Sequence, residues 1–160
     1  MMALSHRPEC LILDEPTSGL DPASRNELLS IISDVSRSSG VTTIFSSHNL
    51  HDVTGIATHI GIIEGGRMLF HSSMKSISTR SRMLSSAHTV QLPASKPPSL
   101  IASKNNRDAQ TKVLITNLMD PDARTFMESL VPGSYTLHTP SLEEIFLFMT
   151  SGVEASETRM

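Results

Sequence analysis

The chain has 160 residues, 38% hydrophobic and 4% aromatic, which is enough for one domain or for part of a domain with a small appendage. Its net charge is −3, from 13 basic and 16 acidic residues without a basic block, so nothing indicates binding to nucleic acid or to an anionic membrane surface. The single cysteine excludes an intramolecular disulfide, and no apolar run approaches the roughly 18 residues of a membrane span.

Residues 1–6 are typical of the end of a helix, which the Arg-Pro pair at 7–8 closes. The apolar run at 10–13 then predicts a buried strand of a parallel sheet, with Cys10 as a small core hydrophobe. Two adjacent carboxylates, Asp14 and Glu15, follow at the carboxyl end of this strand, where open α/β sheets bind ligands. Each of these residues taken singly is explained by a strand, a solvated acidic turn or a helix cap. Only their combination indicates a catalytic or binding site.

Residues 22–39 predict a helix, because Asp21 suits its N-cap and apolar residues recur with helical spacing up to the stop at Gly40. Residues 41–47 are β-branched and apolar and predict a second parallel strand. That strand delivers His48 to the same sheet edge as the two carboxylates. The alternative for His48 is a surface or structural imidazole.

Residues 49–58 predict a short helix, and the apolar runs at 59–64 and 67–70 predict two strands joined by a Gly-Gly turn. Composition then changes, because residues 83–111 are rich in serine and proline. A short helix near 74–82 and a short strand near 89–92 fit the pattern, and the rest of 83–111 is interpreted as a linker. Residues 112–150 predict a β-α-β-α subdomain whose last helix, at 142–150, has a capping box, and 151–160 form a polar tail.

The run Leu-Ile-Leu-Asp-Glu-Pro-Thr-Ser-Gly-Leu-Asp at 11–21 resembles the Walker B strand and D-loop of ABC-type ATPases without interruption. The resemblance implies that Asp14 holds Mg²⁺ near the nucleotide phosphates, through water, and that Glu15 is the general base for the attacking water. It also implies a D-loop that faces a partner ATPase domain. The nucleotide-binding positions that it implies are Asp14, Ser18, Gly19 and Asp21.

Residues 46–50, Ser-Ser-His-Asn-Leu, resemble the H-loop of the same family. The resemblance implies that His48 contacts the γ-phosphate and helps to hold both the water and Glu15. The Gly-Gly hairpin at 65–66 also recurs in ABC ATPases. The run at 140–147, Pro-Ser-Leu-Glu-Glu-Ile-Phe-Leu, resembles the end of the ATPases of the multidrug and polysaccharide export branch, although an ordinary amphipathic helix explains its apolar spacing equally well.

The fold expected from the resemblance is α/β: the C-terminal half of a P-loop NTPase sheet with flanking helices at 1–82, followed by a small α+β subdomain. The implied cofactors are ATP and Mg²⁺. The implied partners are a transmembrane permease and a second ATPase domain in a head-to-tail dimer, with no nucleic acid. The implied location is cytoplasmic, peripheral to a membrane through the permease.

The 160 residues contain no Gly-x-x-x-x-Gly-Lys-Ser/Thr loop, which cradles phosphates in this class, and no Leu-Ser-Gly-Gly signature. We therefore expect the isolated chain to be inactive as an ATP hydrolase. Three explanations fit the absence of these motifs. The sequence favours a fragment of a longer subunit or a gene product that begins at an internal Met over a short chain that another chain completes. Two other functions stay open: a non-catalytic dimerisation or regulatory remnant, and, less favoured, an ABC-like DNA-repair ATPase.

Overall fold

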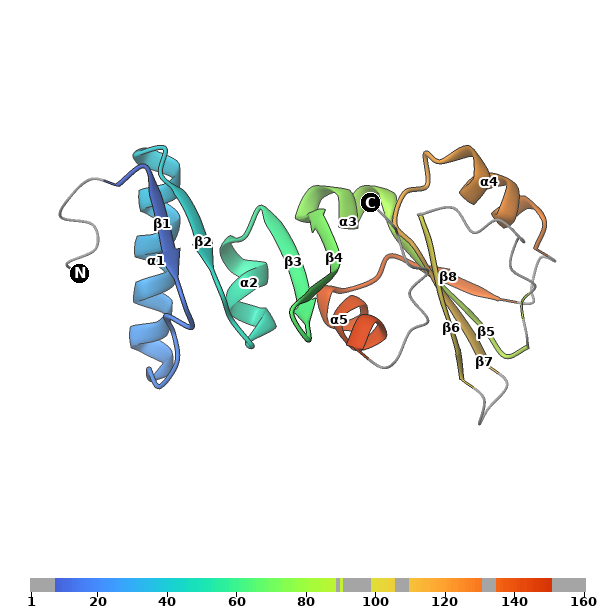
Figure 1. Cartoon of the computed structure of the whole chain (residues 1–160), viewed down its shortest axis with the longest axis horizontal. Helices are drawn as coiled ribbons and strands as arrows, with labels where there is room; N and C mark the ends of the chain where they lie inside the picture. The colour runs from blue at the N-terminus through green and yellow to red at the C-terminus, as the bar shows by residue number, and fades with distance from the viewer. Residues whose placement is uncertain (1–7, 89, 91–98, 106–109, 131–134, 151–160) are drawn as a thin grey trace. The chain divides into compact units, whose positions relative to one another are not determined.

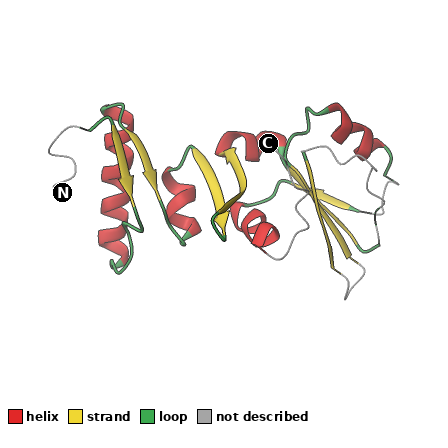
Figure 2. Cartoon of the chain, in the orientation of Figure 1, coloured by secondary structure: helices red, strands yellow, loops and turns green. Residues whose placement is uncertain are grey.

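A computed structural model describes residues 8–88, 90, 99–105, 110–130 and 135–150. The chain divides into two compact units, Met1–Ala57 and Thr58–Met160. Helices and strands mix in both units, and the sheets are small (Figure 2). This mixture is compatible with part of an α/β ATPase. The predictions for residues 1–6 and 151–160, and for most of the strand at 89–92, lie outside the described residues.

The first unit is built on two parallel strands, β1 (Cys10–Leu13) and β2 (Thr42–Phe45). Parallel strands need a crossover connection, and α1 (Pro22–Ser38) supplies it (Figure 1). A short helix, α2 (Leu50–Ile56), follows the second strand. The predicted pair of adjacent parallel strands, joined through a helix, is therefore confirmed.

In this unit α1 packs against one face of the strand pair. Leu29 and Ile32 of α1 are buried, and so is Leu11 of β1. Successive side chains of a strand point to opposite faces, so Ile12 and Ile44 lie on the other face, where they are 74% and 56% exposed.

Cys10 is exposed, so its prediction as a buried core residue is wrong. The reason is architectural: an apolar run predicts burial on both faces, whereas the first unit offers a helix to one face only.

The second unit begins with an antiparallel hairpin of β3 (His59–Glu64) and β4 (Arg67–Ser73). Both turn residues, Gly65 and Gly66, have positive φ angles, 56° and 76°, which a type I′ hairpin turn requires and which glycine adopts without strain. The predicted Gly-Gly hairpin is confirmed. Helix α3 (Met74–Arg80) follows directly.

A four-stranded antiparallel sheet forms the rest of the second unit, in the order β6-β7-β5-β8. Its elements, with the two helices of this region, are β5 (Arg82–Ser86), β6 (Leu100–Asn105), β7 (Gln110–Ile115), α4 (Pro121–Glu128), β8 (Thr136–His138) and α5 (Leu142–Thr150). The core between sheet and helix joins Leu84, Val113 and Ile115 to Ala123 and Phe126 of α4. Both helices predicted within 112–150 are confirmed: α4 is the first, and α5 has the predicted bounds of the last.

Strand β6 and all but the first residue of β5 lie in the predicted linker at 83–111, so the linker prediction is wrong for these residues. Strand β5 lies between β7 and β8, and the strands predicted at 112–138 therefore share their sheet with it. Serine-rich composition concealed the strand. Its apolar residues Met83 and Leu84 are buried by partners distant in sequence, and local composition does not report such partners.

Candidate functional site

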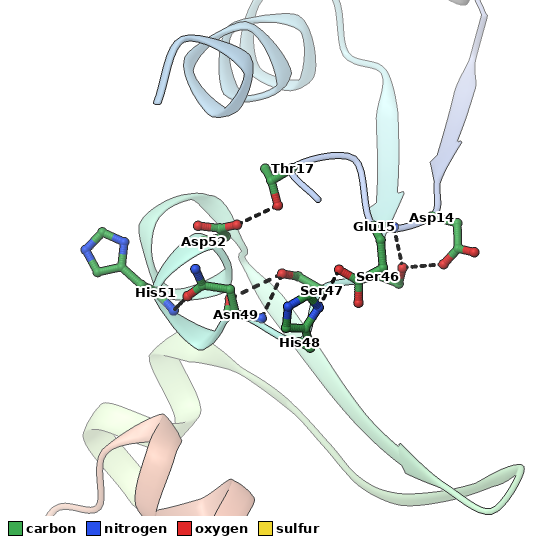
Figure 3. A network of polar contacts seen from close by, with 9 residues as sticks. All are labelled: Asp14, Glu15, Thr17, Ser46, Ser47, His48, Asn49, His51 and Asp52. Carbon is green, nitrogen blue, oxygen red and sulfur yellow. Dashed lines mark hydrogen bonds and ion pairs between the residues drawn. The ribbon is translucent and has the colours of Figure 1, made fainter. Parts of the chain in front are cut away.

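The two strands of the first unit end side by side. Leu13 pairs with Phe45, and the N–H of Ser46 donates to the carbonyl of Leu13 at 2.9 Å. Because neighbouring parallel strands end at the same edge of a sheet, residues 14–15 and 46–48 come together there (Figure 3).

Glu15 and His48 are in direct contact at this edge. The Nδ1 atom of His48 lies 2.8 Å from Oε2 of Glu15 (Figure 3). The side chain of His48 is 79% exposed and that of Glu15 36% exposed, so a ligand in solution can reach both. The proximity predicted from the two motifs is confirmed, whereas the roles of the two residues stay predictions.

Ser46 joins the two carboxylate residues to each other. Its hydroxyl donates to Oδ1 of Asp14 at 2.5 Å and accepts the backbone N–H of Glu15 at 2.7 Å (Figure 3). Asp14 thus reaches the cluster through this hydroxyl, and the exposed edge presents two carboxylates, one imidazole and one hydroxyl.

A tight turn leads from the site into α1. The N–H of Ser18 donates to the carbonyl of Glu15 at 3.0 Å, and Gly19 has a φ of 75°, in the region that favours glycine. Asp21 caps α1: its Oδ1 accepts the N–H groups of Ala23 and Ser24 at 3.0 and 3.1 Å. The Ser24 hydroxyl, which donates at 2.6 Å, is the main cause that lowers the pKa of Asp21.

These contacts place Ser18, Gly19 and Asp21 on the turn and the helix cap that follow the carboxylates. The predicted capping role of Asp21 is confirmed. The nucleotide-binding and dimer-facing roles of the three residues stay predictions.

Thr17 and Asp52 form a buried contact behind the site. Asp52, on α2, has no exposed surface, and its Oδ2 accepts the hydroxyl of Thr17 at 2.7 Å (Figure 3). The contact ties the turn after Glu15 to the helix after His48. Sequence reasoning missed it, because an Asp in the first turn of a helix is ordinarily a solvated residue that complements the helix dipole.

The donor set at this edge fits a magnesium ion that is shared with a substrate. Mg²⁺ is commonly held by one or two carboxylates together with water and phosphate oxygens, and Asp14 offers an exposed carboxylate of this kind. Among the described residues, no three His, Cys, Asp or Glu side chains are grouped so that they could hold a metal alone. In the same part of the chain, no helix is long and apolar enough to cross a membrane.

Comparison with known proteins identifies the class to which part of this chain is similar: the ATP-binding subunits of ABC transporters. The resemblance predicted from the motifs at 11–21 and 46–50 is thereby confirmed. No family model matches the chain.

Three individual relatives illustrate the similarity. The chain is 45% identical over 67 residues to the linearmycin resistance ATP-binding protein LnrL of Bacillus subtilis, which is 42% of this chain and 21% of that protein. It is 39% identical over 80 residues to the bacitracin transport ATP-binding protein BcrA of Bacillus licheniformis, 50% of this chain and 26% of that protein. It is 35% identical over 104 residues to the energy-coupling factor transporter ATP-binding protein EcfA1 of Methanospirillum hungatei, which is 65% of this chain and 36% of that protein. The chain thus spans between a fifth and just over a third of the length of these relatives.

Proposed function

We propose that this chain acts as part of the ATP-binding subunit of an ABC transporter, and that Asp14, Glu15 and His48 belong to its site of ATP hydrolysis. The observation that carries the proposal is the contact of 2.8 Å between Glu15 and His48 at the carboxyl edge of two parallel strands. The similarity to transporter ATP-binding proteins supports the same reaction class.

In this proposal Glu15 is the general base. Its carboxylate orients the attacking water and accepts a proton from it, which a carboxylate with an exposed oxygen can do. The Nδ1 contact fixes the Glu15 side chain, and Nε2 at the other side of the exposed His48 ring is left to face a substrate phosphate.

Asp14 is the residue that would hold Mg²⁺, and a bound ion would neutralise charge on the phosphate oxygens. The chain's own contribution is to orient that carboxylate, which it does through the hydroxyl of Ser46. ATP and Mg²⁺ are therefore the proposed cofactors.

The proposed partners follow from the same class. They are a transmembrane permease and a second ATPase domain that faces residues 18–21, and the chain would work on the cytoplasmic side of a membrane. The match at 140–147 supports the export direction.

A chimera tests the proposal. The segment of the B. licheniformis bacitracin transport ATP-binding protein that this chain matches is replaced by the corresponding residues of this chain, so that Glu15 and His48 lie in a protein of full length. We expect Mg²⁺-dependent ATP hydrolysis, and a fall in kcat of about 10²-fold or more for Glu15→Gln, the usual range for a general base. ATP binding, measured with a fluorescent analogue, should persist in that variant.

The matched control is Glu27→Gln, which makes the same change at an exposed position of α1. A Glu15→Gln chimera as active as the Glu27→Gln chimera would show that Glu15 is not the base. A chimera that binds ATP without turnover would favour the non-catalytic alternative. The 160-residue chain alone should hydrolyse ATP at the background rate.

A further inference from the structure

Glu15 has an unusual backbone conformation. Its φ angle is 43°, and it is the one residue other than glycine with a positive φ in the part of the chain that the structure describes. L-residues disfavour this left-handed region because Cβ approaches the following carbonyl oxygen. A glutamate that adopts it must be held there by its surroundings.

The neighbours of Glu15 in the sequence do not account for this conformation. Pro16 disfavours the right-handed α region for the residue before it, but it leaves extended backbone open as an unstrained choice. The carbonyl of Glu15 accepts the N–H of Ser18 within the turn. The remaining backbone group, the N–H of Glu15, is the one that a distant residue holds.

That distant residue is Ser46. Its single hydroxyl accepts the N–H of Glu15 at 2.7 Å and donates to Oδ1 of Asp14 at 2.5 Å, across 31 and 32 positions of sequence. Contacts hold the strand before Glu15 and the turn after it, so its φ can become negative only if the Asp14–Glu15 peptide plane rotates. That rotation would carry the N–H of Glu15 away from this hydroxyl. The left-handed conformation and the contact of Glu15 with His48 therefore occur together (Figure 3).

We propose that Ser46 is a positioning residue for this site: its hydroxyl holds Glu15 in the left-handed conformation, which sets the carboxylate against His48, and it orients the carboxylate of Asp14. The consequence for hydrolysis rests on the proposed function. The conformational part does not, because it concerns the 160-residue chain without any nucleotide.

The first experiment is NMR spectroscopy of the full chain at one fixed pH. A left-handed residue gives a strong cross-peak between its own amide and α protons, and a hydrogen-bonded amide exchanges slowly. We expect Ser46→Ala to weaken that cross-peak for Glu15 and to speed exchange of its amide about five- to tenfold, as for the loss of one net hydrogen bond. Ser46→Thr keeps a hydroxyl and should restore both signals.

Ser36→Ala is the matched control. It removes a hydroxyl that also links two elements of the first unit, since Ser36 on α1 donates to Thr43 on β2 at 2.8 Å. It should leave both Glu15 signals unchanged. Wild-type signals in Ser46→Ala, or equal changes in Ser36→Ala, would overturn the proposal.

A second variant keeps the test decisive if Ser46→Ala is too unstable for NMR, because its loss of stability can still be measured by chemical denaturation. In the wild-type chain Ser46→Ala loses a hydrogen bond but lets Glu15 relax from its strained conformation, whereas a glycine adopts a positive φ without strain and has none to release. Ser46→Ala should therefore cost more stability in a Glu15→Gly background than in the wild-type chain. Equal costs in the two backgrounds would contradict the role of Ser46 as the restraint on Glu15.

The chimera carries the test to catalysis. Ser46→Ala should lower kcat about tenfold, with KM for ATP within about twofold of the parent, and Ser46→Thr should recover most of the rate. An unchanged kcat would overturn the catalytic consequence. If the parent chimera does not hydrolyse ATP, the proposed function fails, while the two NMR signals of Glu15 still decide the conformational part.

Discussion

At the scale of single residues, the buried Asp52 carboxylate depends on its hydrogen bond from Thr17. Asp52 has no exposed surface, Oδ2 accepts the Thr17 hydroxyl, and Oδ1 has no hydrogen-bond partner among the described residues. A buried carboxylate with one partner depends strongly on that partner, because losing it leaves the group desolvated without compensation.

We therefore predict that Thr17→Val destabilises the first unit by about 1–3 kcal/mol. Valine keeps the shape of threonine but donates no hydrogen bond. Chemical denaturation followed at NMR signals of α1 measures the change. Thr54→Val on the exposed side of α2 is the control and should cost under about 0.5 kcal/mol. Equal effects of the two substitutions would show that the Thr17 contact contributes nothing.

The proximity of Asp14, Glu15 and His48 could be predicted from the sequence, because it needs only two parallel strands that are neighbours in a sheet. Ser46 could not be predicted as their link. That link depends on the register, which sets Leu13 against Phe45 and so brings the next residue of each strand together. The left-handed backbone of Glu15 also left no signal, since glutamate is not a residue that favours it.

At the scale of elements, the first turn of α5 shows how a short motif fixes a helix start. The Ser141 hydroxyl accepts the N–H of Glu144 at 3.1 Å, and Glu144 Oε2 accepts the N–H of Ser141 at 2.8 Å, which confirms the predicted capping box. His138, at the end of β8, adds a contact of 2.9 Å to the other carboxylate oxygen. These contacts favour the ionised carboxylate and so lower the pKa of Glu144 below its usual 4.5. The hydrogen bond from the Ser141 N–H has the largest effect, and the contact with His138 adds to it.

A lowered carboxyl pKa stabilises the fold above the usual pKa, and this contribution is lost as pH falls through the folded-state value. We predict that Glu144→Gln reduces the stability of α5 at pH 7 by about 0.5–1 kcal/mol, a modest figure because the side chain is 46% exposed. The difference from wild type should shrink as pH falls below 4.5. Hydrogen exchange of α5 amides measures it.

Glu143→Gln is the control for this prediction. Glu143 lies in the same first turn, so it experiences the same helix dipole without the two capping contacts. If Glu143→Gln changes the exchange of α5 as much as Glu144→Gln does, the dipole rather than the capping box stabilises this helix.

Elements with local signals were predictable. Asp21 with Pro22, the two turn glycines, and the Ser141–Glu144 box each define an element end through contacts within four residues. Strand β5 has no such signal, because its place in the sheet comes from pairing with β7 and β8 across up to 55 positions.

At the scale of the whole molecule, the two-stranded sheet of the first unit and the four-stranded sheet of the second unit differ in how completely they are covered. In the second unit Leu84, Val113, Leu114 and Ile115 are fully buried within a four-stranded sheet. In the first unit the sheet has two strands, and Ile12 and Ile44 remain 74% and 56% exposed. Burial of an isoleucine side chain stabilises a fold by roughly 1.5–3 kcal/mol, and most of this contribution is lost when the side chain stays in contact with water. A sheet of only two strands also has little stability of its own.

We therefore predict that the 160-residue chain does not open as one cooperative unit. Hydrogen exchange measured by mass spectrometry should give β7 amides about 100-fold or more protection relative to those of β1 and β2, since a few kcal/mol separates their opening free energies. Addition of a partner that covers the exposed face should raise protection in the first unit alone. Equal protection in both units would contradict the prediction.

A pair of neighbouring residues on β1 makes this prediction specific. Leu11 is 7% exposed on the face that α1 covers, and Ile12 is 74% exposed on the opposite face. Leu11→Ala removes buried methyl groups and should lower protection in β1 and β2 strongly, because core truncations of leucine cost about 2–5 kcal/mol. Ile12→Thr replaces an ethyl group that water already surrounds with a hydroxyl and keeps β-branching, so protection there should hardly change. If both substitutions reduced protection equally, Ile12 would be covered in solution, and the weakness of the first unit would need another cause.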